Sequence, residues 1–524
     1  MSPYRLFGLS LLLGVLGALV GMALSCPPTD ASPPPPAADI AGGGEAISPD
    51  PRWLGLIRAR DGSGVRLQAA TPSLDVHLTD RTAAGRVSSP AAVSVRVSRG
   101  ETTLREMTVQ PAPDGDGYLY IAALFPDGYG YCGEPLLPGD VVWAVQGATV
   151  LSLTVPPLSA LADPDADLIS GTAPPSDTVA LYLYPRAAPD AVLTQTAVAD
   201  SEGAYRAGWA DLRPGDTGFA AWNAAPNRAA YLRFVAPLLQ VQVNGAEVLG
   251  MAPPCSGIIL DVTDAAGNPL AQEWAWAGRN GRFNIWLWKG LPQVFPGWRV
   301  RGQAAGQTFS TTVLPVTAQA DRAGGQVLGE APPGAPVRVE VFHGPMQSYY
   351  ESIGRVGPCA SARVTATAQG RYAATLPLAP ADFGAAFAQG PDGHETFARF
   401  AVPYLWVILG RERLWHAYRL QGQVDGMNVP LTLTLQGPTG ALKDIRVLRS
   451  AGNGFFGDLS GDADPFLETG DVLTVETARG VQAALTLLDS TGVQSSTVNN
   501  TTTSPAANDA LVDLGDLPLQ GLSD

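Results

Sequence analysis

Hydrophobic and polar residues alternate with a period of two in many short segments of this chain. Representative segments are 93–97, 179–183, 337–341 and 431–435. Such alternation places one set of side chains in a core and the other in water, as a half-buried β-strand requires. We find no amphipathic helical pattern. The sequence therefore predicts an all-β protein.

These strands belong to a pattern that occurs five times. Each copy begins with a proline-flanked strand, at Pro72, Pro157, Pro237, Pro315 and Pro403. A glycine then opens the next strand, at Gly85, Gly171, Gly250, Gly329 and Gly422, with spacings of 86, 79, 79 and 93 residues. About seven short strands fit in each copy, which is the size of one immunoglobulin-like β-sandwich. We expect five sandwich modules, at 72–156, 157–236, 237–314, 315–402 and 403–490.

Two turn motifs complete each copy. The first is a glycine turn followed by an aromatic residue, as in Asp200-Ser201-Glu202-Gly203-Ala204-Tyr205. The second launches a strand, as in Pro214-Gly215-Asp216. This pattern resembles the immunoglobulin-like repeats of bacterial surface adhesins. The resemblance implies an elongated tandem array of β-sandwiches that is displayed on the cell surface.

The two ends of the chain lack this pattern. Residues 52–71 read as a β-hairpin that packs on the first module, and residues 491–524 are rich in Ser, Thr, Asn and Ala without periodicity. We therefore expect a disordered tail at 491–524. Residues 26–51 hold a proline run and a glycine run, which predicts an extended and partly flexible stalk.

The extreme N-terminus carries a targeting signal. Arg5 precedes an apolar run from Leu6 to Leu24, and the run ends in Ala23-Leu24-Ser25-Cys26. These four residues resemble the lipobox of bacterial lipoproteins, which implies that residues 1–25 are a signal peptide and that Cys26 is lipidated. The alternative is an uncleaved anchor, since nineteen mostly apolar residues nearly span a bilayer. Either way, we expect an exported chain attached to the bacterial cell envelope.

Composition and charge narrow the possible partners. Hydrophobic residues make up 46% of the chain, with 59 Gly and 46 Pro, which suits packed cores joined by many turns. The formal charge is −15, from 33 basic and 48 acidic residues. An acidic chain without a basic cluster argues against nucleic acid as a partner.

Beyond Cys26, the cysteines are Cys132, Cys255 and Cys359, spread over three modules. An exported compartment permits disulfides, but three thiols cannot all pair with one another. We expect that disulfides are not what holds the modules together. No Cys-x-x-Cys motif supports a metal or redox role.

The third module contains a tryptophan-rich segment, with Trp274, Trp276, Trp286 and Trp288. Asn280-Gly281 favours a two-residue hairpin turn, which would pair Trp276 with Ile285. Trp274 and Trp276 would then face the core together with Phe283. The predicted solvent-facing residues are Arg282, Asn284, Trp286 and Trp288.

Two tryptophans side by side on a solvated strand form an apolar platform that can stack on a sugar ring or on a partner protein. We therefore predict a ligand site at Trp286 and Trp288, flanked by Arg282 and Asn284. Two alternatives remain open. A neighbouring module or the second sheet covers these rings, or a three-residue turn places all four tryptophans on one face.

An acidic cluster precedes Gly171, at Asp163, Asp165 and Asp167. Alternating carboxylates in a loop are oxygen ligands that suit Ca²⁺, and calcium at a module junction would stiffen the array. The segment lacks the glycine and glutamate of an EF-hand. The alternative is an ordinary solvated turn.

Enzyme motifs are absent from the sequence. The chain has neither a Gly-x-Ser-x-Gly elbow nor a His-Glu-x-x-His pair, and its four histidines lie far apart. The sequence therefore predicts a lipid-anchored surface protein with a structural or adhesive role and no enzymatic activity. The alternatives are a carbohydrate- or cell-wall-binding protein that uses the tryptophan platform, and a hydrolase with its site between modules.

Overall fold

The computed structural model describes residues 71–495, apart from 115–116, 126–131, 133–134, 288–290, 292, 323, 343–357, 380–381, 410–418, 425–428, 451–454, 460–468, 479 and 488–491. Every regular element within the described residues is a β-strand, which confirms the predicted all-β fold. No helix in this part of the chain is long and apolar enough to cross a bilayer. The signal peptide, the stalk, Cys26 and residues 52–70 of the predicted hairpin lie outside the described residues.

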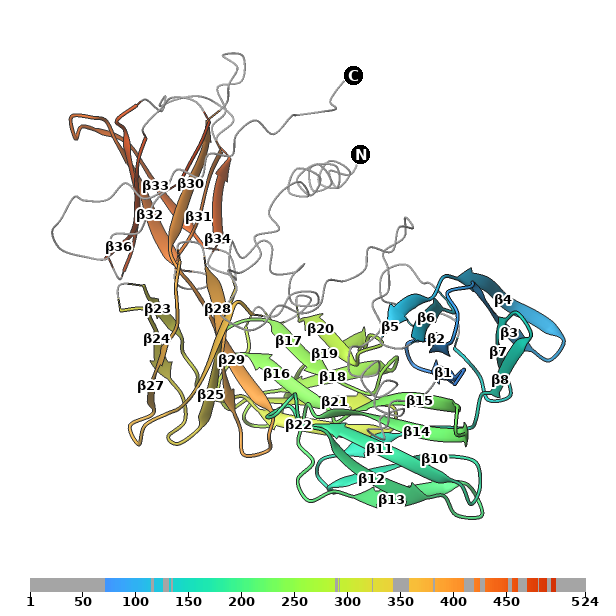
Figure 1. Ribbon diagram of the computed structural model, residues 1–524. Coiled ribbons are helices and arrows are strands. Elements are labelled where there is room, and N and C mark those ends of the chain that lie inside the picture. Colours follow the sequence, from blue (N-terminus) through green and yellow to red (C-terminus); the bar gives the residue numbers. More distant parts are fainter. Residues whose placement is uncertain are drawn as a thin grey trace, which may run out of the picture.

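Each predicted module holds seven or more strands, and we refer to them as modules 1 to 5 (Figure 1). Module 1 contains β1 (Leu74–His77), β2 (Thr82–Val87), β3 (Val93–Arg99), β4 (Thr102–Val109), β5 (Ala112–Asp114), β6 (Gly117–Ala123), β7 (Val141–Gln146) and β8 (Thr149–Thr154). Module 2 contains β9 (Leu161–Asp163), β10 (Leu168–Thr172), β11 (Thr178–Tyr184), β12 (Leu193–Val198), β13 (Ala204–Gly208), β14 (Thr217–Ala225) and β15 (Arg228–Val235).

The later modules repeat this order of strands. Module 3 contains β16 (Leu238–Gln242), β17 (Glu247–Met251), β18 (Gly257–Thr263), β19 (Pro269–Trp276), β20 (Arg282–Trp286), β21 (Arg299–Ala304) and β22 (Gln307–Thr312). Module 4 contains β23 (Gln319–Asp321), β24 (Gln326–Glu330), β25 (Pro336–Phe342), β26 (Ala360–Thr365), β27 (Arg371–Thr375), β28 (Phe383–Gln389) and β29 (Glu395–Ala401).

Module 5 contains β30 (Tyr404–Leu409), β31 (Arg419–Gln423), β32 (Pro430–Gln436), β33 (Leu442–Arg449), β34 (Phe455–Leu459), β35 (Val472–Thr477), β36 (Gly480–Thr486) and β37 (Gly492–Ser495). Residues 492–495 were expected to belong to a disordered tail. Instead they add a strand beside β30, so ordered structure continues past the predicted end of the module. The remainder of the predicted tail, residues 496–524, lies outside the described residues.

Each module is a sandwich of two sheets. In module 3, β20, β17 and β16 lie in one sheet, and β19, β18, β21 and β22 form the other, which we call sheet E. The first, second and fifth strands thus pair with one another, and the third, fourth, sixth and seventh make the facing sheet. This is an immunoglobulin-like arrangement, as the strand count predicted.

The repeated glycine and the repeated aromatic residue lie directly opposite each other in all five modules. The pairs are Gly85 and Tyr120, Gly171 and Tyr205, Gly250 and Phe283, Gly329 and Tyr372, and Gly422 and Phe456. In module 1 this aromatic residue is Tyr120, which is 1% exposed. The absence of a Cβ at each glycine leaves room for the ring on the neighbouring strand.

Two joints between modules are continuous sheets. β1 of module 1 runs parallel to β15 of module 2, which creates one eight-stranded sheet, sheet A. β16 of module 3 runs parallel to β29 of module 4, which creates a seven-stranded sheet, sheet D. In both cases the first strand of one module pairs with the last strand of the next. Modules 1 and 2, and modules 3 and 4, are therefore joined by backbone hydrogen bonds as well as by the chain.

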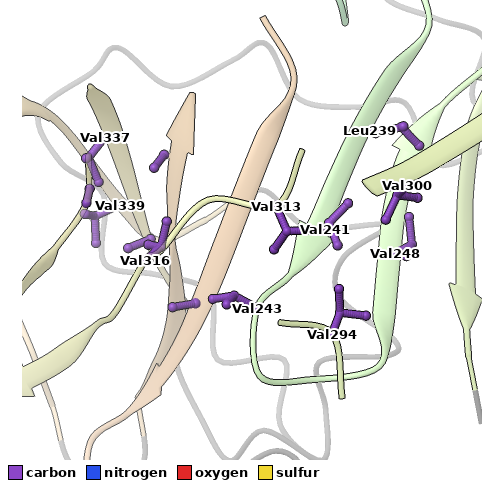
Figure 2. Packing of buried hydrophobic residues seen from close by; sticks show 14 of the residues in the cluster. Leu239, Val241, Val243, Val248, Val294, Val300, Val313, Val316, Val337 and Val339 are labelled. Atoms are coloured by element: carbon purple, nitrogen blue, oxygen red, sulfur yellow. The ribbon is translucent and has the colours of Figure 1, made fainter. Parts of the chain in front are cut away.

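The hydrophobic cores follow the same pairing. One buried cluster spans modules 3 and 4, and Figure 2 shows Val241 and Val248 of module 3 in it together with Val337 and Val339 of module 4. A second cluster spans modules 1 and 2, and a third belongs to module 5. Module 5 stands beyond module 4, on the side away from modules 1 and 2 (Figure 1).

Candidate binding face and module junctions

The tryptophan-rich segment does not form the predicted hairpin. β19 pairs with β18 in sheet E, whereas β20 pairs with β17 in sheet D. The turn at Gly281, whose φ is 78°, therefore carries the chain from one sheet to the other. Trp276 consequently lies opposite Gly257 and Trp274 lies opposite Ile259.

This change of sheet reverses the expected orientation of two tryptophans. Trp274 and Trp276 are 59% and 51% exposed, so the prediction that they face the core is wrong. Ala271 and Ala275, the alternate residues of β19, pack against the core instead. Phe283 is buried on β20, as predicted. The two exposed rings therefore belong to the outer face of sheet E.

The rings of Trp274 and Trp276 form a compact aromatic surface. Their centroids lie 5.3 Å apart and their planes meet at 83°, which is an edge-to-face contact. Both rings lie over Gly257, since a Cβ at that glycine would be 3.6 Å from Nε1 of Trp274 and 3.9 Å from the ring of Trp276. Ile259 extends this surface and is 41% exposed. Because Gly257 has no side chain, the two rings can lie against the backbone of β18 at this position.

Polar side chains continue the same face. Nε2 of Gln272 donates a hydrogen bond to Oδ1 of Asp261 at 2.7 Å, one step along the strands from the tryptophans. Arg301 and Arg299 follow on β21, where both are exposed, and Arg299 donates to Oγ of Ser310 at 3.0 Å. We call Gly257, Ile259, Asp261, Gln272, Trp274, Trp276, Arg299 and Arg301 the sheet E face. It combines aromatic rings with hydrogen-bonding groups, which is the chemistry that a sugar ring requires.

Three of the four residues of the predicted platform, Arg282, Asn284 and Trp286, lie on β20. Arg282 and Asn284 are exposed on β20, as predicted. Trp286 is half-buried, and the guanidinium carbon of Arg399 lies 5.7 Å from its ring centroid. Nδ2 of Asn284 donates to the Glu247 carboxylate at 3.0 Å. Trp288 lies outside the described residues, so a binding role for Trp286 and Trp288 stays a prediction.

Of the three aspartates of the predicted calcium site, Asp163 ends β9, and Asp165 and Asp167 lie in the turn that leads to β10. Oδ1 of Asp163 accepts hydrogen bonds from the backbone N–H groups of Asp165 and Ala166 at 3.1 and 3.2 Å. Oδ1 of Asp167 accepts one from the N–H of Leu212 at 2.8 Å. The Asp163 carboxylate thus shapes the turn, and the Asp167 carboxylate links the turn to the segment before β14. Calcium binding by Asp163, Asp165 and Asp167 stays a prediction.

A buried ion-pair cluster joins module 2 to module 4. The Glu395 carboxylate, at the start of β29, lies 2.6 Å from the Arg186 guanidinium of module 2 and 3.0 Å from that of Arg338. Gln240 of module 3 donates to the same carboxylate oxygen at 2.7 Å. Burial alone would raise the pKa of Glu395, but Arg338 and Arg186 lower that pKa to about 2. The charged carboxylate of Glu395 therefore links modules 2, 3 and 4.

Further polar contacts surround this ion-pair cluster. Glu247 pairs with Arg399 in the same sheet, and both side chains are buried. Nδ1 of His394 accepts a hydrogen bond from the N–H of Leu239 at 3.2 Å, and burial lowers the pKa of His394. At this junction Glu395 and Glu247 are thus both paired with arginines.

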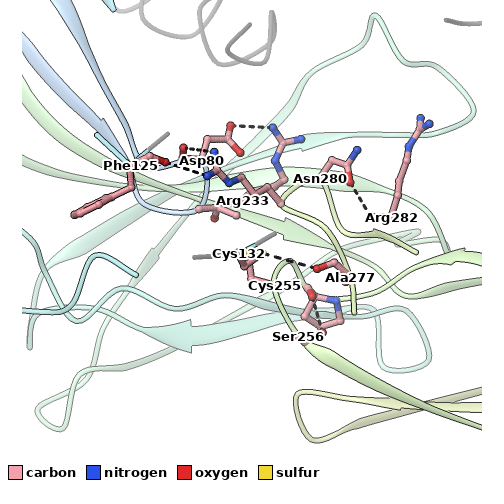
Figure 3. The surroundings of a disulfide bond; sticks show 12 residues. Asp80, Phe125, Cys132, Arg233, Cys255, Ser256, Ala277, Asn280 and Arg282 are labelled. Atoms are coloured by element: carbon pink, nitrogen blue, oxygen red, sulfur yellow. Dashed lines mark hydrogen bonds and ion pairs between the residues drawn. A yellow bond between two sulfur atoms is a disulfide. The ribbon is translucent and has the colours of Figure 1, made fainter. Parts of the chain in front are cut away.

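A disulfide joins modules 1 and 3. Cys132 and Cys255 are bonded with a Cα–Cα distance of 5.4 Å and a sequence separation of 123 residues (Figure 3). Nearby, Arg279 of module 3 donates to the backbone oxygens of Asp80 and Phe125 in module 1, at 3.1 and 3.3 Å. The expectation that disulfides do not hold the modules together is therefore wrong for this pair. The sequence could not show it, because the pairing depends on a lateral contact between modules that are not consecutive.

A shallow hollow lies on module 5. Its volume is about 410 Å³, and its lining includes Thr432, Val447 and Glu476. It lies beside β33, the end strand of its sheet, where Ile445 and Val447 are 53% and 75% exposed. β33 occupies the place in module 5 that β19 occupies in module 3, but it carries aliphatic rather than aromatic residues.

Comparison with known proteins leaves the chain without a family. No family model matches the sequence, and no curated protein matches it. A tetra-tandem repeat from the extending region of a large adhesion protein is 17% identical over 66% of this chain and 100% of that chain, with a TM-score of 0.14. The BSP domain of a biofilm-associated protein is 9% identical over 65% of this chain and 98% of that chain, with a TM-score of 0.15.

E. coli alpha-2-macroglobulin is 9% identical over 81% of this chain, which spans 36% of that protein, with a TM-score of 0.15. Likenesses this distant do not assign a function.

Proposed function

We propose that this chain is an exported, lipid-anchored protein of the bacterial cell surface, and that its modules serve as a structural scaffold for adhesion. The disulfide between Cys132 and Cys255 carries the export part of the proposal, because structural disulfides persist in oxidising compartments. The lipobox-like segment that ends in Cys26 supports anchoring. Two shared sheets and the Glu395 cluster support a scaffold role, since they restrain four modules against one another.

Anchoring is tested with the full chain expressed in a bacterium that processes lipoproteins. We expect the wild-type protein to incorporate a labelled fatty acid and to enter the detergent phase, and a Cys26→Ala variant to do neither. Equal labelling of both proteins would contradict lipidation at Cys26. Surface exposure is then read from protease accessibility on intact cells.

A second function is favoured by the sheet E face, namely carbohydrate binding. The face presents Trp274 and Trp276 beside Asp261, Gln272 and Arg301. Aromatic rings stack on the apolar face of a sugar, and the polar groups fix its hydroxyls by hydrogen bonds. Such a site would give the scaffold its adhesive contact with a cell-wall or host glycan.

Carbohydrate binding is tested with a glycan array and with pull-down on insoluble polysaccharides and peptidoglycan. We expect the double variant Trp274→Ala and Trp276→Ala to lose at least tenfold in affinity for any glycan that the wild-type protein binds. The matched control is Ile445→Ala with Val447→Ala, which removes exposed apolar groups from the corresponding strand of module 5. Unchanged binding by the tryptophan variant, or an equal loss in the control, would overturn this assignment.

A further inference from the structure

The joints in sheets A and D begin with similar hydrogen bonds that differ in their acceptor. At the joint of modules 1 and 2, the N–H of Leu74 on β1 donates to the backbone oxygen of Asn227 at 2.9 Å. At the joint of modules 3 and 4, the N–H of Leu239 on β16 donates to Nδ1 of the His394 side chain at 3.2 Å. Asn227 and His394 hold the same position, directly before the last strand of their module. A carbonyl oxygen accepts at any ordinary pH, whereas a protonated imidazole nitrogen becomes a donor.

His394 lies where modules 2, 3 and 4 meet, and it is 5% exposed. Its turn packs against module 2, since a Cβ at Gly393 would lie 2.8 Å from Cδ of Pro214. The residue that follows it is Glu395, whose carboxylate lies 2.6 Å from the Arg186 guanidinium of module 2. The imidazole is therefore enclosed in the junction rather than exposed at its surface.

The backbone ladder beside this histidine is short. β16 and β29 form three register pairs, beginning with Gln240 opposite Glu395. The bond from Leu239 to His394 lies one residue before the first of these pairs, and Leu239 is fully buried. Without its acceptor, the N–H of Leu239 would be a buried donor that lacks this partner, which destabilises the folded arrangement.

We propose that His394 is a pH-sensitive switch at this junction, and that its protonation in mild acid loosens the attachment of module 4 to modules 2 and 3. When the ring is neutral and carries its proton on Nε2, Nδ1 accepts the hydrogen bond from Leu239. A proton on Nδ1 places a donor against that N–H, so the bond is lost. Modules 1 and 3 remain linked in acid by the disulfide between Cys132 and Cys255.

The charges around the ring decide the pH range. The charged groups of the junction belong to Asp165 and Arg186 in module 2, and to Arg338, Asp392 and Glu395 in module 4. The three carboxylates favour the protonated ring, but burial opposes it more strongly and lowers the pKa of His394 from its ordinary value of 6.5. The fold thus favours the neutral ring, so this stabilisation is complete above pH 6.5 and is lost as the pH falls from 6.5 towards the folded pKa. The loss begins at a higher pH than the loss from Glu395, whose ordinary pKa is 4.5.

The test is hydrogen–deuterium exchange of the full chain at pH 7.5 and 5.0, with rates corrected for the intrinsic effect of pH. A ring that is freed by opening has its ordinary pKa, so the change to pH 5.0 favours the open junction by up to about 30-fold. We expect backbone exchange in residues 238–243 to rise at least fivefold in the wild-type protein. In His394→Asn the amide oxygen accepts without titrating, and exchange should change less than twofold.

Two results of this experiment would overturn the proposal. One is a wild-type protein whose corrected exchange in residues 238–243 is the same at both pH values. The other is an acid response that persists in His394→Asn. Such a response would belong to another group, such as Glu247, whose pKa is raised by burial and which is present in both proteins.

Two further variants separate the switch from a general effect on folding. His394→Ala removes the acceptor at every pH, so its exchange at pH 7.5 should match that of the wild-type protein in acid. The matched control is His77→Asn, because His77 is also buried and its Nδ1 accepts the N–H of Asp80 at 2.9 Å, but within module 1. This control should keep the full acid response in residues 238–243. Loss of the response in His77→Asn, or slow exchange of His394→Ala at pH 7.5, would contradict the switch.

Discussion

Tyr205 lies directly opposite Gly171 on the neighbouring strand, and its hydroxyl donates a hydrogen bond to the backbone oxygen of Ser159 at 2.7 Å. The tyrosine ring thereby crosses β10 and reaches a backbone oxygen in the segment that leads into β9. Tyr120 and Tyr372 make the same bond in modules 1 and 4, to Ser73 and Thr317 at 3.0 and 2.6 Å. Modules 3 and 5 have phenylalanine at this position and so lack the hydroxyl. The packing of an aromatic ring on the opposite glycine is therefore the feature that all five modules share.

The glycine at this pair is predicted to be intolerant of any side chain. In Gly171→Ala the new Cβ would lie 2.0 Å from the backbone oxygen of Ser159, and backbone atoms there cannot move aside cheaply. Overpacking of this kind costs about 1–3 kcal/mol in the free energy of unfolding. The control is Gly208→Ala, because a Cβ at Gly208 meets nothing within 4 Å. Denaturant unfolding of both variants checks the prediction, which equal stability of the two would contradict.

The disulfide between modules 1 and 3 is predicted to stabilise the fold. Cross-linking residues 123 positions apart restricts the unfolded chain, and such bonds typically contribute about 2–4 kcal/mol. We expect a variant with Cys132→Ser and Cys255→Ser to melt at a lower temperature than the wild-type protein under non-reducing conditions. Peptide mapping without reduction should recover the two cysteines in one cross-linked peptide. Recovery in separate peptides would contradict the bond.

The Glu395 cluster predicts a loss of stability in acid. The pKa of Glu395 is about 2 in the folded state and 4.5 ordinarily, so the folded protein favours the charged form. This stabilisation is complete above pH 4.5 and is lost as the pH falls from 4.5 towards 2. Two and a half pKa units correspond to about 3 kcal/mol.

A Glu395→Gln variant reports this effect directly. We expect it to be less stable than the wild-type protein at pH 7, and the difference to shrink as unfolding is measured at lower pH. Glu330→Gln, at an exposed position on β24, serves as the control and should leave the stability curve unchanged. A difference that is constant with pH would show that the carboxylate charge is not what ties the modules.

The tryptophans of the sheet E face are predicted to be dispensable for folding. Trp274 and Trp276 are more than half exposed, and surface substitutions away from buried contacts usually change stability by about 0.5 kcal/mol or less. We expect the double alanine variant to keep its unfolding midpoint. Its remaining tryptophan fluorescence should be quenched less by iodide, since two rings that are more than half exposed are gone. A lowered midpoint would indicate that these rings are covered in the folded protein.

Local patterns in the sequence predicted the all-β fold and its strands because each strand depends on local rules. Period-two alternation located the strands, and the recurring glycine and aromatic residue turned out to be one cross-strand contact repeated five times. The orientation of Phe283 followed from the same reasoning. These features are decided within about eighty residues of chain, where the alternation and turn chemistry suffice.

The exposed face of sheet E and the contacts between modules were harder to predict, because they depend on residues far apart in the sequence. Trp274 and Trp276 were placed in the core since Asn280-Gly281 suggested a tight hairpin, whereas the chain changes sheets there. The sequence did offer one signal. The small residues Ala271 and Ala275 occupy the alternate positions of β19, and they, rather than the tryptophans, pack against the core. No local pattern links Cys132 with Cys255, or Arg186 with Glu395, which is 209 residues away.

The Cys132–Cys255 bond also decides how the chain would respond to tension. A pull on the two ends of the described chain passes directly from module 1 to module 3 through the sulfur atoms, and all of module 2 lies within the bypassed loop. Fully extended, the 123 residues between the cysteines would lengthen the chain by roughly 400 Å. The disulfide prevents this extension. Module 2 therefore bears none of the applied force while the bond is intact.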